Sequence, residues 1–182
     1  MVVFDKNFKE IFFSEAISIS LGLIAGILLA ISTNKLIFIP GILFILPGFL
    51  EMQGNLSGTL ASRISSGLFI GFIDTKHLYR REKLIKGNII ASFLLALIIC
   101  TFLGLVGVVF TFFAFRRLVI EILFLPIIAG FIANIIEIPI TILTTLYLFK
   151  AGHDPNNIMG PFLTSIGDIV SVGSLLLALI II

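Results

Sequence analysis

The chain is poor in the residues from which many catalytic and disulfide-bonded sites are built. Its 182 residues include one cysteine, Cys100, two histidines, His77 and His153, and no tryptophan. A single cysteine excludes an internal disulfide and a cluster of cysteine metal ligands. Two histidines, both expected in turns, are a poor basis for a zinc site. No glycine-rich loop follows a strand, because no strand pattern is present, so this chain is not expected to hydrolyse ATP by itself.

Charged residues are also scarce. They form 12% of the chain, against 59% hydrophobic residues, and the mean hydropathy is +1.23. Several apolar runs approach or exceed the roughly 20 residues that a helix needs to cross a bilayer. Segments of alternating polarity are missing, so a β-barrel is not expected. The composition therefore predicts an all-α membrane protein with little mass outside the lipid bilayer.

Turn residues divide the chain into five expected transmembrane helices. After a short cytoplasmic N-terminus (1–10) and with a tight turn at 32–35, we expect helices at about 11–31, 36–71, 88–115, 118–150 and 158–182. The second helix is longer than a bilayer is thick, so we expect it to tilt, to kink at a proline, or to break near Gly54 and Asn55. Residues 11–182 are expected to form a single five-helix transmembrane domain.

Positive charge predicts the orientation of the helices. The segment at about 73–87 is strongly basic and should be a cytoplasmic loop, whereas Lys35, Arg116 and Arg117 should lie outside. This places the N-terminus in the cytoplasm and the protein in the plasma membrane as a multi-pass protein. Nucleic-acid binding is the alternative explanation of the basic segment, but a cytoplasmic loop accounts for it, and we expect no nucleic-acid partner.

The most polar stretch of the chain lies within the second expected helix. Small residues recur every four positions and form a ridge on one side of the helix: Gly54, Gly58, Ser62 and Ser66. An overlapping polar stripe consists of Glu51, Asn55, Thr59, Ser62 and Ser65. Such a helix can pack closely against a neighbour and still present oxygens and an amide to a cavity, which a helix facing lipid would not do.

Asp168 is the strongest single candidate for function. It lies near the middle of the last expected helix, where a carboxylate facing lipid costs about 2.5–3.5 kcal/mol. It should therefore face a wet cavity or a partner, and Thr164, Ser165 and Ser171 place hydroxyls on the same face. The alternative is a structural Asp that is capped by these hydroxyls or paired with Arg63.

Other polar residues extend the candidate site. Neutral oxygens at Gly54 and Asn55, together with one carboxylate, suit a divalent cation such as Mg²⁺ that keeps most of its water. Asn55 has a helix-packing role as its alternative, and Glu51 is either a cation-attracting group at a mouth or a wetted helix residue. Asn134 and Glu137 share a helical face and could line the same path, although we slightly favour pairing of Glu137 with Arg63.

Two motifs carry a resemblance to a known family. The first is Pro47-Gly48 followed by Gly54-Asn55-xxx-Thr59-Leu-Ala-Ser62-Arg63-x-Ser65, and the second is Asp154-Pro155-Asn156-Asn157-xxx-Pro161-xxx-Thr164-Ser165-x-Gly167-Asp168. Together with the order of five helices, they resemble the membrane region of the MgtE family of divalent cation transporters. They are closest to the branch shared with eukaryotic solute carriers.

The resemblance implies a site and an assembly. Asp168 is similar to the cation-binding Asp of the family, Gly54 and Asn55 match a pore-lining turn, and Thr164 and Ser165 match adjacent hydroxyls. Two five-helix units of the family enclose a central pore lined by the second and fifth helices. One unit here implies a homodimer or a heterodimer with a related chain. The cytoplasmic sensing domains of bacterial members have no counterpart in residues 1–10, so their regulation is not carried over.

These observations predict a channel or transporter for divalent cations, with Mg²⁺ favoured as the transported ion and no cofactor. The first alternative is a non-transporting partner subunit that supplies half of a pore. The second is an intramembrane enzyme, which would need another deep catalytic residue facing Asp168.

Overall fold

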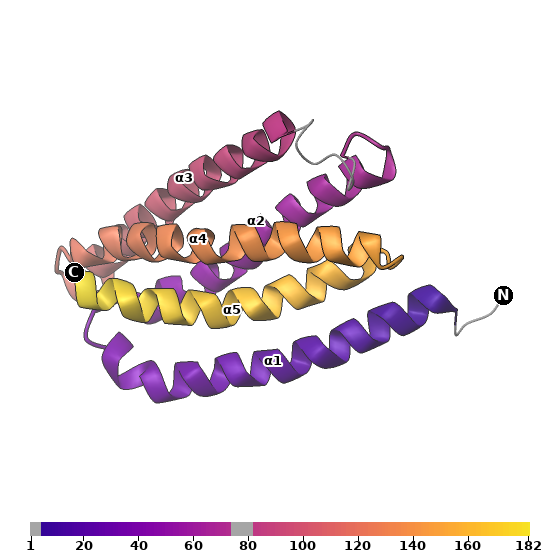
Figure 1. Ribbon diagram of the computed structural model, residues 1–182. Coiled ribbons are helices and arrows are strands. Elements are labelled where there is room, and N and C mark those ends of the chain that lie inside the picture. The colour runs from indigo at the N-terminus through magenta and orange to yellow at the C-terminus, as the bar shows by residue number, and fades with distance from the viewer. Residues whose placement is uncertain (1–4, 74–81) are drawn as a thin grey trace.

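The computed structural model describes residues 5–73 and 82–182, and its regular secondary structure in these ranges consists of helices, without strands (Figure 1). The five helices are α1 (Lys6–Leu36), α2 (Ile42–Phe69), α3 (Glu82–Phe115), α4 (Glu121–Lys150) and α5 (Pro155–Ile181). The predicted all-α class and the predicted number of helices are therefore confirmed over the described residues.

Four of the five helices have the length and composition of membrane spans. These are α1, α3, α4 and α5, and α2 is not among them. The difference follows from sequence, because α2 carries Glu51, Gln53, Asn55 and Arg63 within 28 residues. The chain is a multi-pass helical membrane protein, but its second helix is too polar to be recognised as a span by hydropathy.

Helix boundaries differ from expectation at both ends of the first loop. The turn predicted at 32–35 is wrong, because α1 continues to Leu36 and the chain turns at 37–41 instead. Thr33 donates its hydroxyl hydrogen to the Leu29 carbonyl oxygen at 2.8 Å, which keeps this residue compatible with the helix. The turn itself uses Gly41, whose φ of 85° suits a residue without a side chain.

The starts of the three later helices shift as well. Helix α3 begins at Glu82 rather than near 88, α4 begins at Glu121 rather than near 118, and α5 begins at Pro155 rather than near 158. The earlier start of α5 has a local cause, because the Asp154 side chain caps it by accepting a hydrogen bond from the Asn156 backbone N–H at 2.9 Å. The predicted basic loop lies largely outside the described residues, and Lys83 and Lys86 belong to α3.

Helix α2 is continuous through its glycines. It is helical from Ile42 to Phe69, so the break considered near Gly54 and Asn55 does not occur. Pro47 lies inside α2 and lacks the N–H that would bond to the Leu43 carbonyl, yet the helix continues through it. The backbone carbonyls at Gly54 therefore stay within the helix, and side chains rather than freed carbonyls must form any ion path along α2.

The helices form a bundle with α2, α4 and α5 in contact with one another. Helix α1 packs against α5 at one edge, and α3 packs against α4 and α2 at the other (Figure 1). The main core joins α2, α4 and α5 through buried apolar side chains that include Phe49, Leu125 and Leu175. Helix α1 begins at one end of the bundle and α5 finishes at the opposite end (Figure 1).

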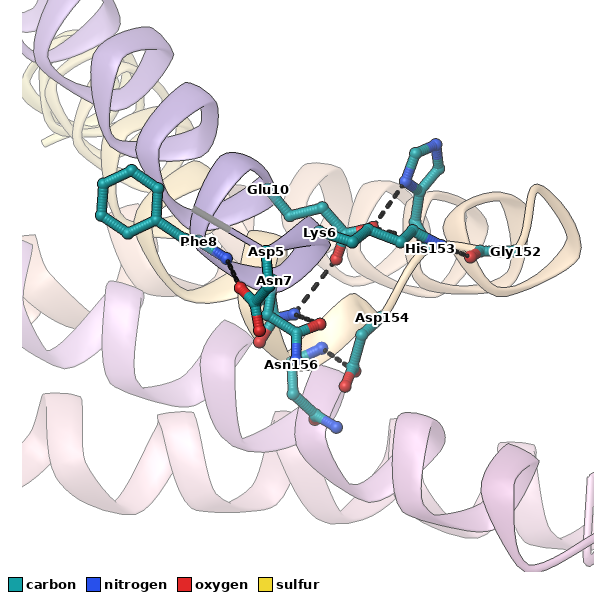
Figure 2. Close-up of polar contacts among 10 residues, drawn as sticks. Asp5, Lys6, Asn7, Phe8, Glu10, Gly152, His153, Asp154 and Asn156 are labelled. Atoms are coloured by element: carbon teal, nitrogen blue, oxygen red, sulfur yellow. Dashed lines mark hydrogen bonds and ion pairs between the residues drawn. The ribbon is translucent and has the colours of Figure 1, made fainter. Parts of the chain in front are cut away.

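Polar contacts fasten the beginning of α1 to the turn between α4 and α5 (Figure 2). The Glu10 carboxylate lies 2.9 Å from His153 Nδ1 and accepts a hydrogen bond from Asn157 Nδ2 at 3.1 Å. Lys6 Nζ donates to the Gly152 carbonyl at 2.6 Å. These contacts join the start of α1 to the turn, in addition to the packing of α1 along α5.

Two glycines allow α3 and α4 to approach closely. A Cβ atom added to Gly104 would lie 2.5 Å from the Leu123 carbonyl oxygen, and one added to Gly130 would collide with Cys100 Sγ. Small residues at such crossings let helix backbones approach, which favours association within a bilayer.

Replacing Gly104 with leucine should therefore destabilise the bundle. We expect Gly104→Leu to lower the free energy of unfolding by about 1–3 kcal/mol, because backbone atoms cannot move aside as a flexible side chain can. The control is Gly22→Leu in α1, where an added Cβ meets nothing within 4 Å. Unfolding in detergent, followed by circular dichroism, compares the two, and equal stability would contradict the close packing of α3 on α4.

Candidate functional site

One face of α2 is polar and exposed, although the helix lies within an apolar protein. Glu51, Asn55, Thr59, Ser62 and Ser66 are all exposed. The opposite face packs into the bundle through buried residues that include Phe49, Met52, Leu56, Leu60 and Ile64. The predicted polar stripe is confirmed in these positions, except that Ser65 is buried and Ser66 occupies the exposed position.

The polar face of α2 borders a groove that is shared with α5. The groove has a volume of about 420 Å³ and is lined by Gly54, Asn55, Gly58, Thr59, Ser62 and Arg63 from α2 and by Gly160 and Thr164 from α5. The groove is open beside two of its glycines, since a Cβ added to Gly58 or Gly160 would meet nothing within 4 Å. At Gly54 the two helices touch, because an added Cβ would lie 3.5 Å from Thr164.

The groove presents oxygen atoms that can accept hydrogen bonds from the water molecules around a hydrated ion. Asn55 Nδ2 donates to Glu51 Oε1 at 3.0 Å, so the amide of Asn55 is oriented by a side chain one turn earlier. Thr164 donates its hydroxyl hydrogen to the Gly160 carbonyl at 3.0 Å. This leaves the lone pairs of the Thr164 oxygen available for a ligand.

Asp168 lies one helical turn beyond Thr164 and is half-buried. Its carboxylate is close enough to those of Glu51 and Glu137 to interact with them electrostatically. Within the described residues it makes no hydrogen bond or ion pair, so the alternative pairing with Arg63 does not occur there. Asp168 is thus a carboxylate near the groove whose charge is left without a partner in the single described chain.

Glu137 is buried where α2, α4 and α5 meet. Ser57 donates to its Oε2 at 2.6 Å, while Oε1 has no hydrogen-bond partner among the described residues. Gly167 of α5 lies beside this carboxylate, because a Cβ added there would be in van der Waals contact with both of its oxygens at 3.8 Å. The favoured pairing of Glu137 with Arg63 is wrong, since Ser57 is its partner and Arg63 is exposed in the groove.

Several expected site residues do not line the groove. Asn134 is buried and donates to the Gly130 carbonyl at 2.7 Å within α4. Ser165 faces α1, where its oxygen lies 2.6 Å from that of Ser18. Ser171 is buried, and its hydroxyl has no partner among the described residues. Thr164 is the one of the three expected α5 hydroxyls that borders the groove.

The structure also adds residues that sequence reasoning did not assign to the site. Gly58 and Arg63 were visible in the α2 motif, and Gly160 lies one turn before Thr164, so helical spacing could have identified all three. Gln53 is different, because it is fully buried although polar, and neither polar atom of its amide has a partner among the described residues. It lies one turn from the buried Phe49 and Leu56, so helical spacing places it on the packed face of α2 and not in the groove.

The donor set suits an ion that keeps much of its own water. Among the described residues, no group of three or more His, Cys, Asp or Glu side chains is placed to hold a metal ion. The groove instead is lined by amide and hydroxyl oxygens and by Arg63, and the carboxylates of Glu51 and Asp168 lie one helical turn from its lining residues Asn55 and Thr164. Hydrated Mg²⁺ is bound in this way, through few direct ligands.

Taken together, the helices and the groove define a multi-pass membrane protein with a polar path along α2 and α5. The family model described as MgtE, a divalent cation transporter, matches residues 46–178, which span all the groove residues. The chain therefore belongs to the MgtE family of divalent cation transporters. No solved structure matches the chain.

The hydrogen bond between Ser57 and Glu137 should contribute measurably to stability. Ser57→Ala leaves a buried carboxylate without the one partner that it has among the described residues, and we expect a loss of about 1–3 kcal/mol in the free energy of unfolding. Ser66→Ala, on the exposed face, is the matched control and should change stability by less than about 0.5 kcal/mol. Thermal unfolding in detergent measures both, and a Ser57→Ala variant as stable as the control would remove this contact from the account.

Proposed function

We propose that this chain transports divalent cations, with Mg²⁺ as its main substrate, along the groove between α2 and α5 at the interface of a dimer. Membership of the MgtE family supports divalent cation transport. The observation that carries the finer proposal is the exposed polar face of α2 beside the unpaired carboxylate of Asp168.

A second copy of the chain explains how this face is tolerated in a bilayer. A charged side chain facing lipid at the bilayer centre costs about 2.5–3.5 kcal/mol, and α2 exposes both Glu51 and Arg63. A twofold axis along the groove would turn the polar face of each α2 toward its partner. The open space at Gly58 permits the close approach that such an interface needs.

The two ends of the groove differ in charge. Glu51 and Arg63 are twelve positions apart on α2, which is about 18 Å along a helix. Cations are therefore attracted to the end with Glu51 and Asp168 and disfavoured at the end with Arg63. In the dimer, two Asp168 carboxylates and two Asn55 amides would face one hydrated cation.

Such a ring of acceptors favours a dication over a monovalent ion. Paired carboxylates raise the negative charge density at one point of the pore. The neutral oxygens of Asn55 and Thr164 accept hydrogen bonds from the water shell that the ion keeps. Glu137 lies behind this ring, inside the protomer, where it holds α4 against α2 through Ser57. In this proposal its role is structural, and the ion passes on the other side of α2.

The proposal includes a plasma-membrane location with the N-terminus in the cytoplasm. The ends of α2 and α4 that flank the basic segment and the turn at Gly152 would then face the cytoplasm. The alternative assembly is a heterodimer in which this chain supplies one half of the pore, and it predicts no transport by this chain alone.

Asp168→Asn is expected to abolish transport without disturbing the fold. The substitution keeps the size of the side chain and removes two charges from a dimeric pore, so uptake of Mg²⁺ into liposomes containing the purified chain should fall at least about tenfold. Glu121→Gln in the first turn of α4, an exposed carboxylate away from the groove, is the matched control.

The size of the assembly is measured on the same samples by gel filtration. Equal uptake by wild type and Asp168→Asn would exclude Asp168 from the mechanism. Absence of uptake by every variant, including wild type, would contradict the homodimeric pore and favour the heterodimer.

A further inference from the structure

An apolar groove lies at the opposite end of α2 from Arg63. It has a volume of about 490 Å³ and is lined only by apolar residues, which come from the linker at 37–41, from the first turn of α2 and from the end of α3. Volumes of about 300–1,000 Å³ are typical of sites that hold small molecules. This groove is separate from the one that contains Asn55 and Thr164.

The walls of this linker groove are fixed by close packing. Gly41 brings the linker directly onto α3, because an added Cβ would lie 2.5 Å from the Thr111 methyl carbon. The rings of Phe44 and Phe110 are stacked with their centroids 3.9 Å apart, and Phe115 meets Phe110 edge to face at 6.1 Å. The groove is therefore formed in the single chain and needs no partner to shape it.

Positive charge lies at the same end of the bundle. Arg116 and Arg117 follow Phe115 directly, both are exposed, and neither forms an ion pair within the described residues. Lys35 is also nearby, but it shares a different pocket with Glu121, whose charge opposes its own. The two arginines are thus the uncompensated cations beside the linker groove.

We propose that the linker groove binds an acyl chain of an anionic phospholipid whose phosphate is held by Arg116 and Arg117. Apolar walls suit the chain, and a guanidinium group matches a phosphate with two parallel hydrogen bonds. The end of α3, where the helix stops and the arginines begin, is the position at which a headgroup meets a membrane protein.

Charge argues against a second copy as the occupant. A symmetric contact through this groove would bring two pairs of arginines toward one another, and like charges across an interface are unfavourable. The polar face of α2, which needs cover in the bilayer, borders a different groove. A lipid satisfies both the apolar walls and the two positive charges.

Native mass spectrometry of the purified chain tests this directly. The probes are phosphatidylglycerol and phosphatidylcholine with identical acyl chains, so that only the charge of the headgroup differs. We expect wild type to prefer the anionic lipid by about fivefold for each arginine, or about 25-fold in total. The double variant Arg116→Gln/Arg117→Gln should lose this preference, while Lys9→Gln/Lys150→Gln should keep it.

A variant that fills the groove separates the acyl-chain contact from the charge effect. Leu43 lines the groove and is 54% exposed, so Leu43→Trp adds volume there without entering the core, and it should weaken binding of both lipids. Equal binding of the two lipids by wild type, or an unchanged preference in the double arginine variant, would overturn the proposal. A Leu43→Trp variant that changes the oligomeric state but not the lipid count would assign the groove to a second copy instead.

Discussion

The structure is organised by the need to keep a polar helix out of lipid. Helix α2 carries a run of polar residues between Glu51 and Ser66, and α3, α4 and α5 all pack against it. Inside the bundle, Ser57 donates a hydrogen bond to one oxygen of the buried Glu137, and Gly167 of α5 lies beside the carboxylate. The face left uncovered is the one that borders the groove with Asn55 and Thr164. The same requirement thus explains both the packing of the helices and the position of the candidate ion path.

Much of this arrangement could be predicted from the sequence because hydropathy and helical spacing are local properties. Five helices follow from the apolar runs, and the polar stripe from Glu51 to Ser62 follows from a spacing of three and four residues. The turn predicted at 32–35 is misplaced because polar residues such as Thr33 are typical of turns, whereas the Thr33 hydroxyl donates a hydrogen bond within the helix. Gly41 was the more informative residue, since its backbone conformation favours glycine.

The direction in which each polar side chain faces could not be predicted, because it depends on which helix packs where. Thr164 and Ser165 are adjacent in sequence and equally polar, yet one borders the groove and the other bonds to α1 through Ser18. Glu137 was expected to pair with an arginine, since opposite charges attract, but the parallel packing of α4 on α2 places Ser57 beside it. Knowledge of these contacts requires the tertiary structure.

In the proposed dimer, the uncovered face of α2 meets a second copy of the chain. Disulfide cross-linking in native membranes tests it most directly, with Gly58→Cys as the reporter in a Cys100→Ala background. Gly22→Cys on α1 is the matched control, because neither site has an atom within 4 Å of an added Cβ. We expect mild oxidation to produce a covalent dimer of the Gly58→Cys chain and none of the Gly22→Cys chain. A monomeric Gly58→Cys chain, or equal cross-linking at both sites, would contradict the proposed dimer.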